Sequence, residues 1–199
     1  MFLSRLTILR LPLIGAAACL LAGCISIGED PPPALLTLTP EAQLQDGTGP
    51  SGAATAALTV MRPEVPGSLS VTRVPVQVDP STIAYLKDAV WVDRPAKLFQ
   101  NLLVTTIRER TGRLVLDDVE SRSGTAVVLR GTLREFGYDA QSQSAVVTYD
   151  AIRESEGQLQ TRRFSAQVPG VLAEPAPVGM ALNEAANRVA AEVAAWVGE

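Results

Sequence analysis

The chain has 199 residues, of which 47% are apolar and 19% charged, and its formal net charge is −4. This length and apolar content suit one folded domain with a buried core and exclude wholesale disorder. The acidic balance disfavours nucleic-acid binding, which needs a positively charged surface. The sequence contains no histidine, which excludes histidine-dependent hydrolase triads and histidine-ligated metal sites. We therefore expect a non-enzymatic protein with no catalytic residue, no metal site and no dissociable cofactor.

The first 23 residues have the composition of a secretory signal peptide. Arg5 and Arg10 precede an uncharged stretch, 11–22, which at about 12 residues is too short to span a membrane. Residues 21–24, LAGC, then resemble the lipobox of bacterial lipoproteins, in which cleavage before the cysteine leaves a thiol that carries a diacylglycerol. We expect Cys24 to be lipidated. The alternative is an ordinary signal peptide followed by an incidental cysteine.

Cleavage at this position divides the chain into three parts. They are a signal peptide, a lipidated tether and a folded domain, over residues 1–23, 24–34 and 35–199. Three successive prolines at 31–33 favour an extended tether. Ile25 follows the cysteine where an aspartate tends to retain lipoproteins at the inner membrane. We therefore expect an anchor in the outer membrane, with the domain facing the periplasm.

Extended segments precede the first predicted helix. They cover residues 35–38, 58–61, 71–78, 83–86 and 89–92. Pro75 lies within the third of these segments, and because proline donates no ladder hydrogen bond we expect an edge strand or a bulge there. Residues 43–57 are rich in glycine and small polar side chains, which is typical of a mobile loop.

The hydrophobic period changes from two to 3.6 after Asp93. We expect Asp93 as the N-cap of a helix and Pro95 in its first turn. One apolar stripe follows, made of Leu98, Phe99, Leu102, Leu103 and Ile107. Gly112 is typical of the residue that ends a helix.

The second half of the chain predicts four strands and a final helix. A strand begins at Val115, and an antiparallel meander follows over residues 126–138, 145–152 and 159–168. Apolar residues spaced by three and four between Val178 and Trp196 predict a C-terminal helix. The order βββαββββα predicts an α/β fold: a mixed, largely antiparallel sheet with two helices packed on one face.

Several short motifs occur in an order that matches a known family. They are the lipobox, the segment LLTLTP at 35–40, the pattern Tyr85-x5-Trp91-x3-Pro95, and Arg163-Phe164 ahead of the C-terminal helix. Together they resemble the ABC-type transport auxiliary lipoprotein family across nearly the whole chain after the signal peptide. The resemblance implies a fold like that of the N-terminal domain of TolB.

The same resemblance implies a function and partners. Members are outer-membrane lipoproteins that work with MCE-type lipid transporters, whose inner-membrane part is an ABC permease and ATPase. The implied role is to dock the periplasmic transporter, through its MCE-domain protein, to the outer membrane and so to support lipid traffic between the membranes. Two alternatives stay open: a lipoprotein that itself binds and carries a lipid, and a scaffold of another envelope complex. A homo-oligomer is compatible with the sequence.

Two aromatic residues and one arginine in the Tyr-x5-Trp-x3-Pro motif are candidates for partner binding, namely Tyr85, Trp91 and Arg94. Aromatic side chains dominate the energetics of many interfaces. Tyr85 and Trp91 therefore either contact a partner or lipid, or fill the gap between sheet and helix.

Two further candidates, Arg130 and Arg134, lie on the first strand of the meander. Strict alternation places them on its polar face, with Phe136 and Tyr138 further along the same face. The arginines either meet an acidic partner or lipid phosphates, or belong to a solvated sheet face.

Overall fold

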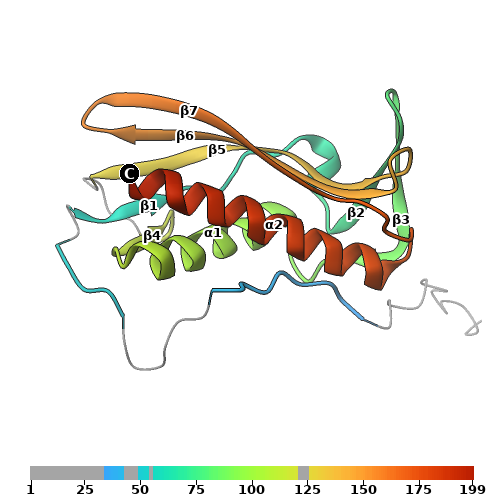
Figure 1. Ribbon diagram of the computed structural model, residues 1–199, viewed down its shortest axis with the longest axis horizontal. Coiled ribbons are helices and arrows are strands. Elements are labelled where there is room, and N and C mark those ends of the chain that lie inside the picture. Colours follow the sequence, from blue (N-terminus) through green and yellow to red (C-terminus); the bar gives the residue numbers. More distant parts are fainter. Residues whose placement is uncertain (1–33, 43–48, 54–55, 121–125) are drawn as a thin grey trace, which may run out of the picture. The chain divides into compact units, whose positions relative to one another are not determined.

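The computed structural model describes residues 34–42, 49–53, 56–120 and 126–199 (Figure 1). The predicted signal peptide, Cys24 and nearly all of the predicted tether lie outside the described residues, as does much of the predicted loop at 43–57.

The described residues form seven strands and two α-helices in the predicted order. The strands are β1 (Leu58–Val60), β2 (Arg73–Asp79), β3 (Thr82–Val90), β4 (Val115–Asp117), β5 (Val127–Asp139), β6 (Ser144–Ser155) and β7 (Gln158–Val168). The helices are α1 (Pro95–Thr111) and α2 (Pro175–Gly198), and a short 3-10 helix, η2 (Gly67–Leu69), precedes β2.

The long strand β5 organises the sheet. It pairs antiparallel with β6, which pairs antiparallel with β7, so the predicted meander is confirmed. On its other side β5 pairs in parallel with β1 near its start and with β2 near its end. The strands β4 and β3 lie outside β1 and β2 respectively. The sheet is therefore mixed, as the sequence predicts.

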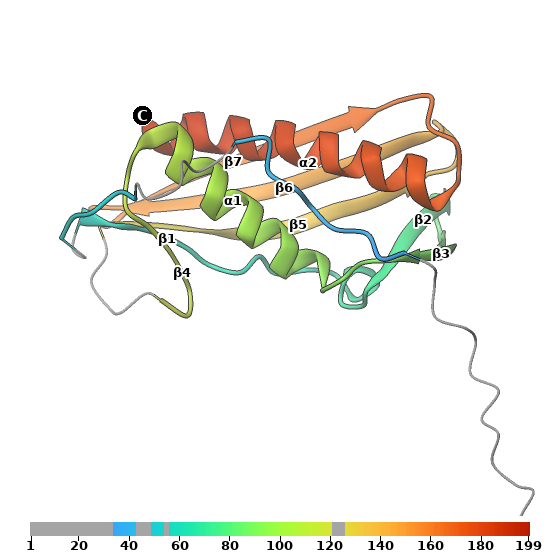
Figure 2. The same ribbon diagram turned by 90° about the horizontal axis from the view of Figure 1, so that it is seen from below.

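Both helices cover the same face of the sheet, which confirms the predicted two-layer arrangement (Figures 1 and 2). Aromatic rings fill the layer between them. Phe99 of α1 packs edge-on against Tyr149 and Phe136, with ring centroids 5.3 and 6.5 Å apart. Such pairs add directional contacts to the burial of apolar surface that stabilises the core. Among the described helices, none is both long and apolar enough to cross a membrane.

The ends of α1 show why its N-cap differs from the expected one. Pro95 is the first helical residue and Gly112 ends the helix in the left-handed conformation, at φ 63°, as predicted. The cap is Arg94 rather than Asp93, because a proline forces the residue before it into an extended conformation. Asp93 instead accepts the backbone N–H of Arg94, at 2.6 Å.

The β2–β3 hairpin contains irregularities that the sequence only partly indicates. The segments 83–86 and 89–92 were expected as separate pieces, yet β3 runs continuously to Val90. Asp88 takes a left-handed conformation, at φ 58°, and the register with β2 shifts near Pro75. Because β2 pairs on both sides, the proline marks a bulge rather than an edge strand.

The first described segment, residues 34–42, runs along α2 as a strap (Figure 2). Only Leu36 takes part in the sheet, through a parallel bridge to Trp91, so the strand predicted at 35–38 is reduced to one bridge. Further along, Asn187 of α2 accepts the N–H of Glu41 at 2.9 Å and donates to the carbonyl of Thr39 at 3.0 Å. A buried amide therefore holds the strap on the helix.

Candidate partner-binding face

Figure 1 shows that one face of the meander points away from the helices. Alternate residues of its strands place charged and polar side chains on that face. We call it the open face. Its main members are Arg130, Arg134, Thr148, Asp150, Glu154 and Arg163. They come from alternate positions of β5, β6 and β7, because successive side chains in a strand point to opposite faces.

The centre of the open face is one carboxylate between two arginines. Asp150 of β6 accepts two hydrogen bonds from Arg163, at 2.6 and 2.8 Å, and one from Arg134, at 2.9 Å. These hydrogen bonds, those of Arg163 most strongly, lower the pKa of Asp150 to about 2. The carboxylate is therefore ionised at any physiological pH, and it fixes both guanidinium groups in place.

A bulge in β5 explains how Arg134 reaches Asp150. The register runs from Leu133 opposite Tyr149 directly to Glu135 opposite Thr148, so Arg134 is an extra residue on β5. The extra residue leaves Arg134 and Glu135 exposed side by side, whereas strict alternation would expose only one of them.

The same bulge corrects one sequence-based expectation. Phe136 and Tyr138 do not share a face with Arg130 and Arg134. They are only 1% and 4% exposed and point into the core, because the bulge reverses the alternation for the rest of β5. Beyond the bulge at Arg134, the open face therefore lacks the two aromatic side chains that the sequence pattern places there.

Further polar contacts extend the open face on both sides of Asp150. Thr148 donates to Glu135 at 2.6 Å and lies 2.9 Å from the hydroxyl of Ser165 on β7. Arg130 is 3.9 Å from Glu154, a looser ion pair between two half-exposed side chains. The open face is thus a pre-arranged set of hydrogen-bond donors and acceptors.

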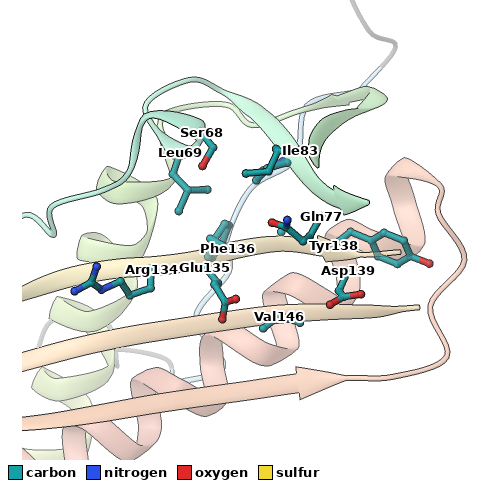
Figure 3. Close-up of a pocket in the computed structure, with 12 residues that line it drawn as sticks. Ser68, Leu69, Gln77, Ile83, Arg134, Glu135, Phe136, Tyr138, Asp139 and Val146 are labelled. Carbon is teal, nitrogen blue, oxygen red and sulfur yellow. The ribbon is translucent and has the colours of Figure 1, made fainter. Parts of the chain in front are cut away.

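A small pocket lies beside this cluster, between β5 and the β2–β3 hairpin. Figure 3 shows Arg134 and Glu135 on one side and Ser68, Leu69 and Ile83 on the other. Its volume is about 110 Å³. That is room for one side chain of a partner, well below the ~300 Å³ at which small-molecule pockets begin.

The other candidate residues lie elsewhere. Trp91 is 1% exposed and packs on Phe136 with ring centroids 5.2 Å apart. Of its two predicted roles, Trp91 therefore has the second, which is to fill the core between sheet and helix. Tyr85 is half-buried beneath the guanidinium of Arg73, which lies 4.3 Å from its ring centroid. Arg94 is exposed at the start of α1 and lines a groove of about 450 Å³. The structure therefore brings only Arg130 and Arg134 together on one face.

Sequence reasoning missed Asp150 and Arg163 as members of the site. Arg163 belongs to the Arg163-Phe164 motif that the family resemblance rests on, and this signal could have singled it out. Its pairing with Asp150 depends on the exact register of β6 and β7, which their sequences do not specify.

Comparison with known proteins gives a family and a fold. Residues 36–194 match the model of the family described as ABC-type transport auxiliary lipoprotein component. Among solved structures, protein XCC0632 from Xanthomonas campestris, of family DUF330, superposes with a TM-score of 0.67 at 17% identity, covering 83% of this chain and 95% of that one. An uncharacterized protein gives a TM-score of 0.63 at 16% identity, with coverage of 72% and 92%.

A more distant similarity is to a PelC dodecamer from Paraburkholderia phytofirmans, with a TM-score of 0.39 and 15% identity, covering 73% of this chain and 91% of that one. No curated protein sequence matches the chain. At such low identity the structures of the two nearer proteins show that the fold is shared.

Proposed function

The chain belongs to the ABC-type transport auxiliary lipoprotein component family, and we propose that it docks the periplasmic part of an MCE-type lipid transporter to the outer membrane. In this proposal the protein acts without catalysis. A lipid on Cys24 holds it at the outer membrane, and the open face binds the transporter, whose ABC permease and ATPase lie in the inner membrane.

The observation that carries the proposal is the cluster of Arg134, Asp150 and Arg163. Two guanidinium groups share one carboxylate and Glu135 is exposed beside Arg134, so the cluster is balanced in charge but orders two cationic groups at the surface. Both arginine side chains are more than half exposed, at 57% and 65%, and keep N–H groups free for an acidic partner. Because Asp150 already holds them in place, binding immobilises little additional side-chain freedom.

The tether supports the same role. Ala34 lies ten positions after Cys24, and an extended chain would rise about 3.1 Å per position, which gives a reach of roughly 31 Å. A short tether converts weak docking into a local event at high effective concentration. A weakly binding open face is therefore sufficient once the protein is anchored.

The alternative of a lipid carrier is less well supported. The layer between sheet and helices is filled by packed side chains, including Trp91, Phe99 and Tyr149. The pocket on the open face holds about 110 Å³ and has charged residues on its rim. The larger groove at the start of α1, about 450 Å³, is lined in good part by charged residues, namely Arg62, Glu64, Asp93, Arg94 and Lys97. These features favour a surface that docks over an interior that carries lipid.

Crosslinked affinity purification of the full-length lipoprotein from membranes tests the proposal. We expect the wild-type lipoprotein to recover an MCE-domain protein and its ABC permease. We expect neither protein to be recovered with Cys24→Ala or with the double variant Arg134→Ala, Arg163→Ala. The matched control is Arg188→Ala, which breaks an exposed ion pair with Glu184 on α2, away from the open face. Recovery of outer-membrane assembly factors alone would contradict the proposal.

A further inference from the structure

Four segments meet at the end of the domain where the strap begins. Leu36 bridges Trp91 and also contacts Gly179 in the first turns of α2. The loop before α2 is held to the β5–β6 turn by the N–H of Val171, which donates to the carbonyl of Gln143 at 2.9 Å. Figures 1 and 2 both place the β2–β3 turn at this end as well. We call it the tether end: the start of the strap, the β2–β3 and β5–β6 turns, and the start of α2 with the loop before it.

Exposed apolar side chains gather at the tether end. Ten large apolar side chains are exposed in the described residues, and six of them belong to the tether end or to the residue bonded to its strap: Leu35, Val78, Ile83, Val92, Leu172 and Met180. Single exposed apolar residues are ordinary on protein surfaces, but their concentration on one end needs a reason.

The two turns and the loop before α2 carry acidic and no basic side chains. Asp79, Asp139 and Glu174 lie in the two turns and in the loop before α2, and residues 77–83, 139–143 and 169–180 contain neither lysine nor arginine. Attraction to anionic lipid headgroups therefore cannot hold this end on a membrane. Contact with a bilayer must come from the apolar side chains.

The position of the strap indicates which end of the domain faces the membrane. The chain enters the described domain at the tether end, and Ala34 lies ten positions after Cys24. The 24-residue helix α2 starts at this end and extends about 36 Å away from it. An anchor on Cys24 thus keeps the tether end next to the bilayer and holds the opposite end, where Val119 and Leu159 are exposed, further from it.

We propose that the tether end rests on the lipid surface, with its six exposed apolar side chains at the boundary between headgroups and acyl chains. This inference rests on the lipid anchor of the proposed function. It adds an orientation: α2 points away from the membrane, and the open face stands roughly upright beside it, accessible to a partner that arrives from the periplasm.

Fluorescent labelling of single-cysteine variants in reconstituted lipoprotein tests the orientation. Cys19 leaves with the signal peptide and Cys24 is blocked by lipid, so an introduced cysteine is the one reactive thiol. Leu172→Cys reports the tether end, and Leu159→Cys is its matched control, because the two leucines are similarly exposed, at 66% and 59%. Each variant carries an environment-sensitive dye and sits in phosphatidylcholine vesicles that contain a nitroxide-labelled lipid.

We expect the dye at Leu172 to lose most of its fluorescence to the lipid nitroxide, while the dye at Leu159 keeps it. Equal quenching at both positions, or none at either, overturns the proposal. Quenching at Leu172 that appears only with phosphatidylglycerol and disappears at high salt also overturns it, because that contact would be electrostatic. The transporter is absent from these vesicles and the mass of the N-terminal peptide reports the lipid separately, so failure here is distinct from failure of docking.

Discussion

Asp150 and Arg163 face each other in register across β6 and β7, and two hydrogen bonds of 2.6 and 2.8 Å join the carboxylate to the guanidinium group. Arg134 binds the same carboxylate from the bulge in β5. One acidic residue thereby orders arginines from both neighbouring strands. These two ordered guanidinium groups are the chemical feature of the open face.

The pH dependence of stability isolates the contribution of Asp150. Its pKa in the folded chain, about 2, is below the ordinary value of 3.8. The pair therefore stabilises the fold fully above about pH 4, and this stabilisation is lost as the pH falls toward 2. Urea unfolding of the wild type and Asp150→Asn should differ by a small, constant amount above pH 4, and the difference should shrink as the pH falls through 2. A difference that grows on acidification contradicts this assignment.

Deletion of Arg134 tests the bulge. Because Arg134 is the extra residue, its removal leaves Leu133 and Phe136 pointing inward and Glu135 outward, as regular alternation requires. We expect this deletion variant to fold with a loss of about 1–2 kcal/mol or less in the free energy of unfolding. Under regular alternation, deleting Thr132 instead turns Leu133 outward and Arg134 into the core. Circular dichroism and urea unfolding compare the two deletion variants. An equal loss of stability in both would contradict the bulge at Arg134.

Gly131 provides a test of the close approach between β5 and β6. A Cβ at this position would lie 2.1 Å from the carbonyl oxygen of Asp150 and 2.9 Å from the hydroxyl of Tyr149. We expect Gly131→Ala to reduce the free energy of unfolding by about 3 kcal/mol, since backbone atoms must move. Gly67→Ala is the control, because a Cβ there meets nothing within 4 Å. Similar melting temperatures for the two variants would contradict the observed pairing.

Asn187 tests the attachment of the strap. Its side chain is 4% exposed and bonds to Thr39 and Glu41. Asn187→Ala leaves those backbone groups without these partners, so we expect a loss of about 1–3 kcal/mol. Hydrogen exchange should show loss of protection at the Glu41 amide. Asn101→Ala, at an exposed position of α1, should leave exchange at Glu41 unchanged. If the Glu41 amide stays protected in Asn187→Ala, the Asn187 side chain does not hold the strap on α2.

Periodicity predicts most of the fold. The meander, both helices and the two-layer arrangement follow from alternation of period two and 3.6, and Gly112 ends α1 as predicted. The bulge at Arg134 could also have been predicted, because Leu133 and Phe136 are three apart, where a regular strand places inward residues two apart. The continuity of β3 could not, since it depends on the left-handed conformation of Asp88.

The site was less predictable than the fold. Arg130 and Arg134 were found because polar residues alternate with apolar ones, which is a local property of β5. The partnership of Asp150 with Arg163 is a cross-strand property, fixed by turn geometry and by the packing of the opposite face. Lipidation of Cys24 stays a prediction, because that residue lies outside the described part of the chain.

Site-specific photo-crosslinking tests the central claim, that the open face meets the transporter. A photoreactive phenylalanine analogue in place of Thr161, an exposed open-face position on β7, should crosslink in membranes to an MCE-domain protein. The same analogue in place of Glu192, exposed on α2, should not. Crosslinking from Glu192 and none from Thr161 would show that the helical layer docks instead, and would contradict the account.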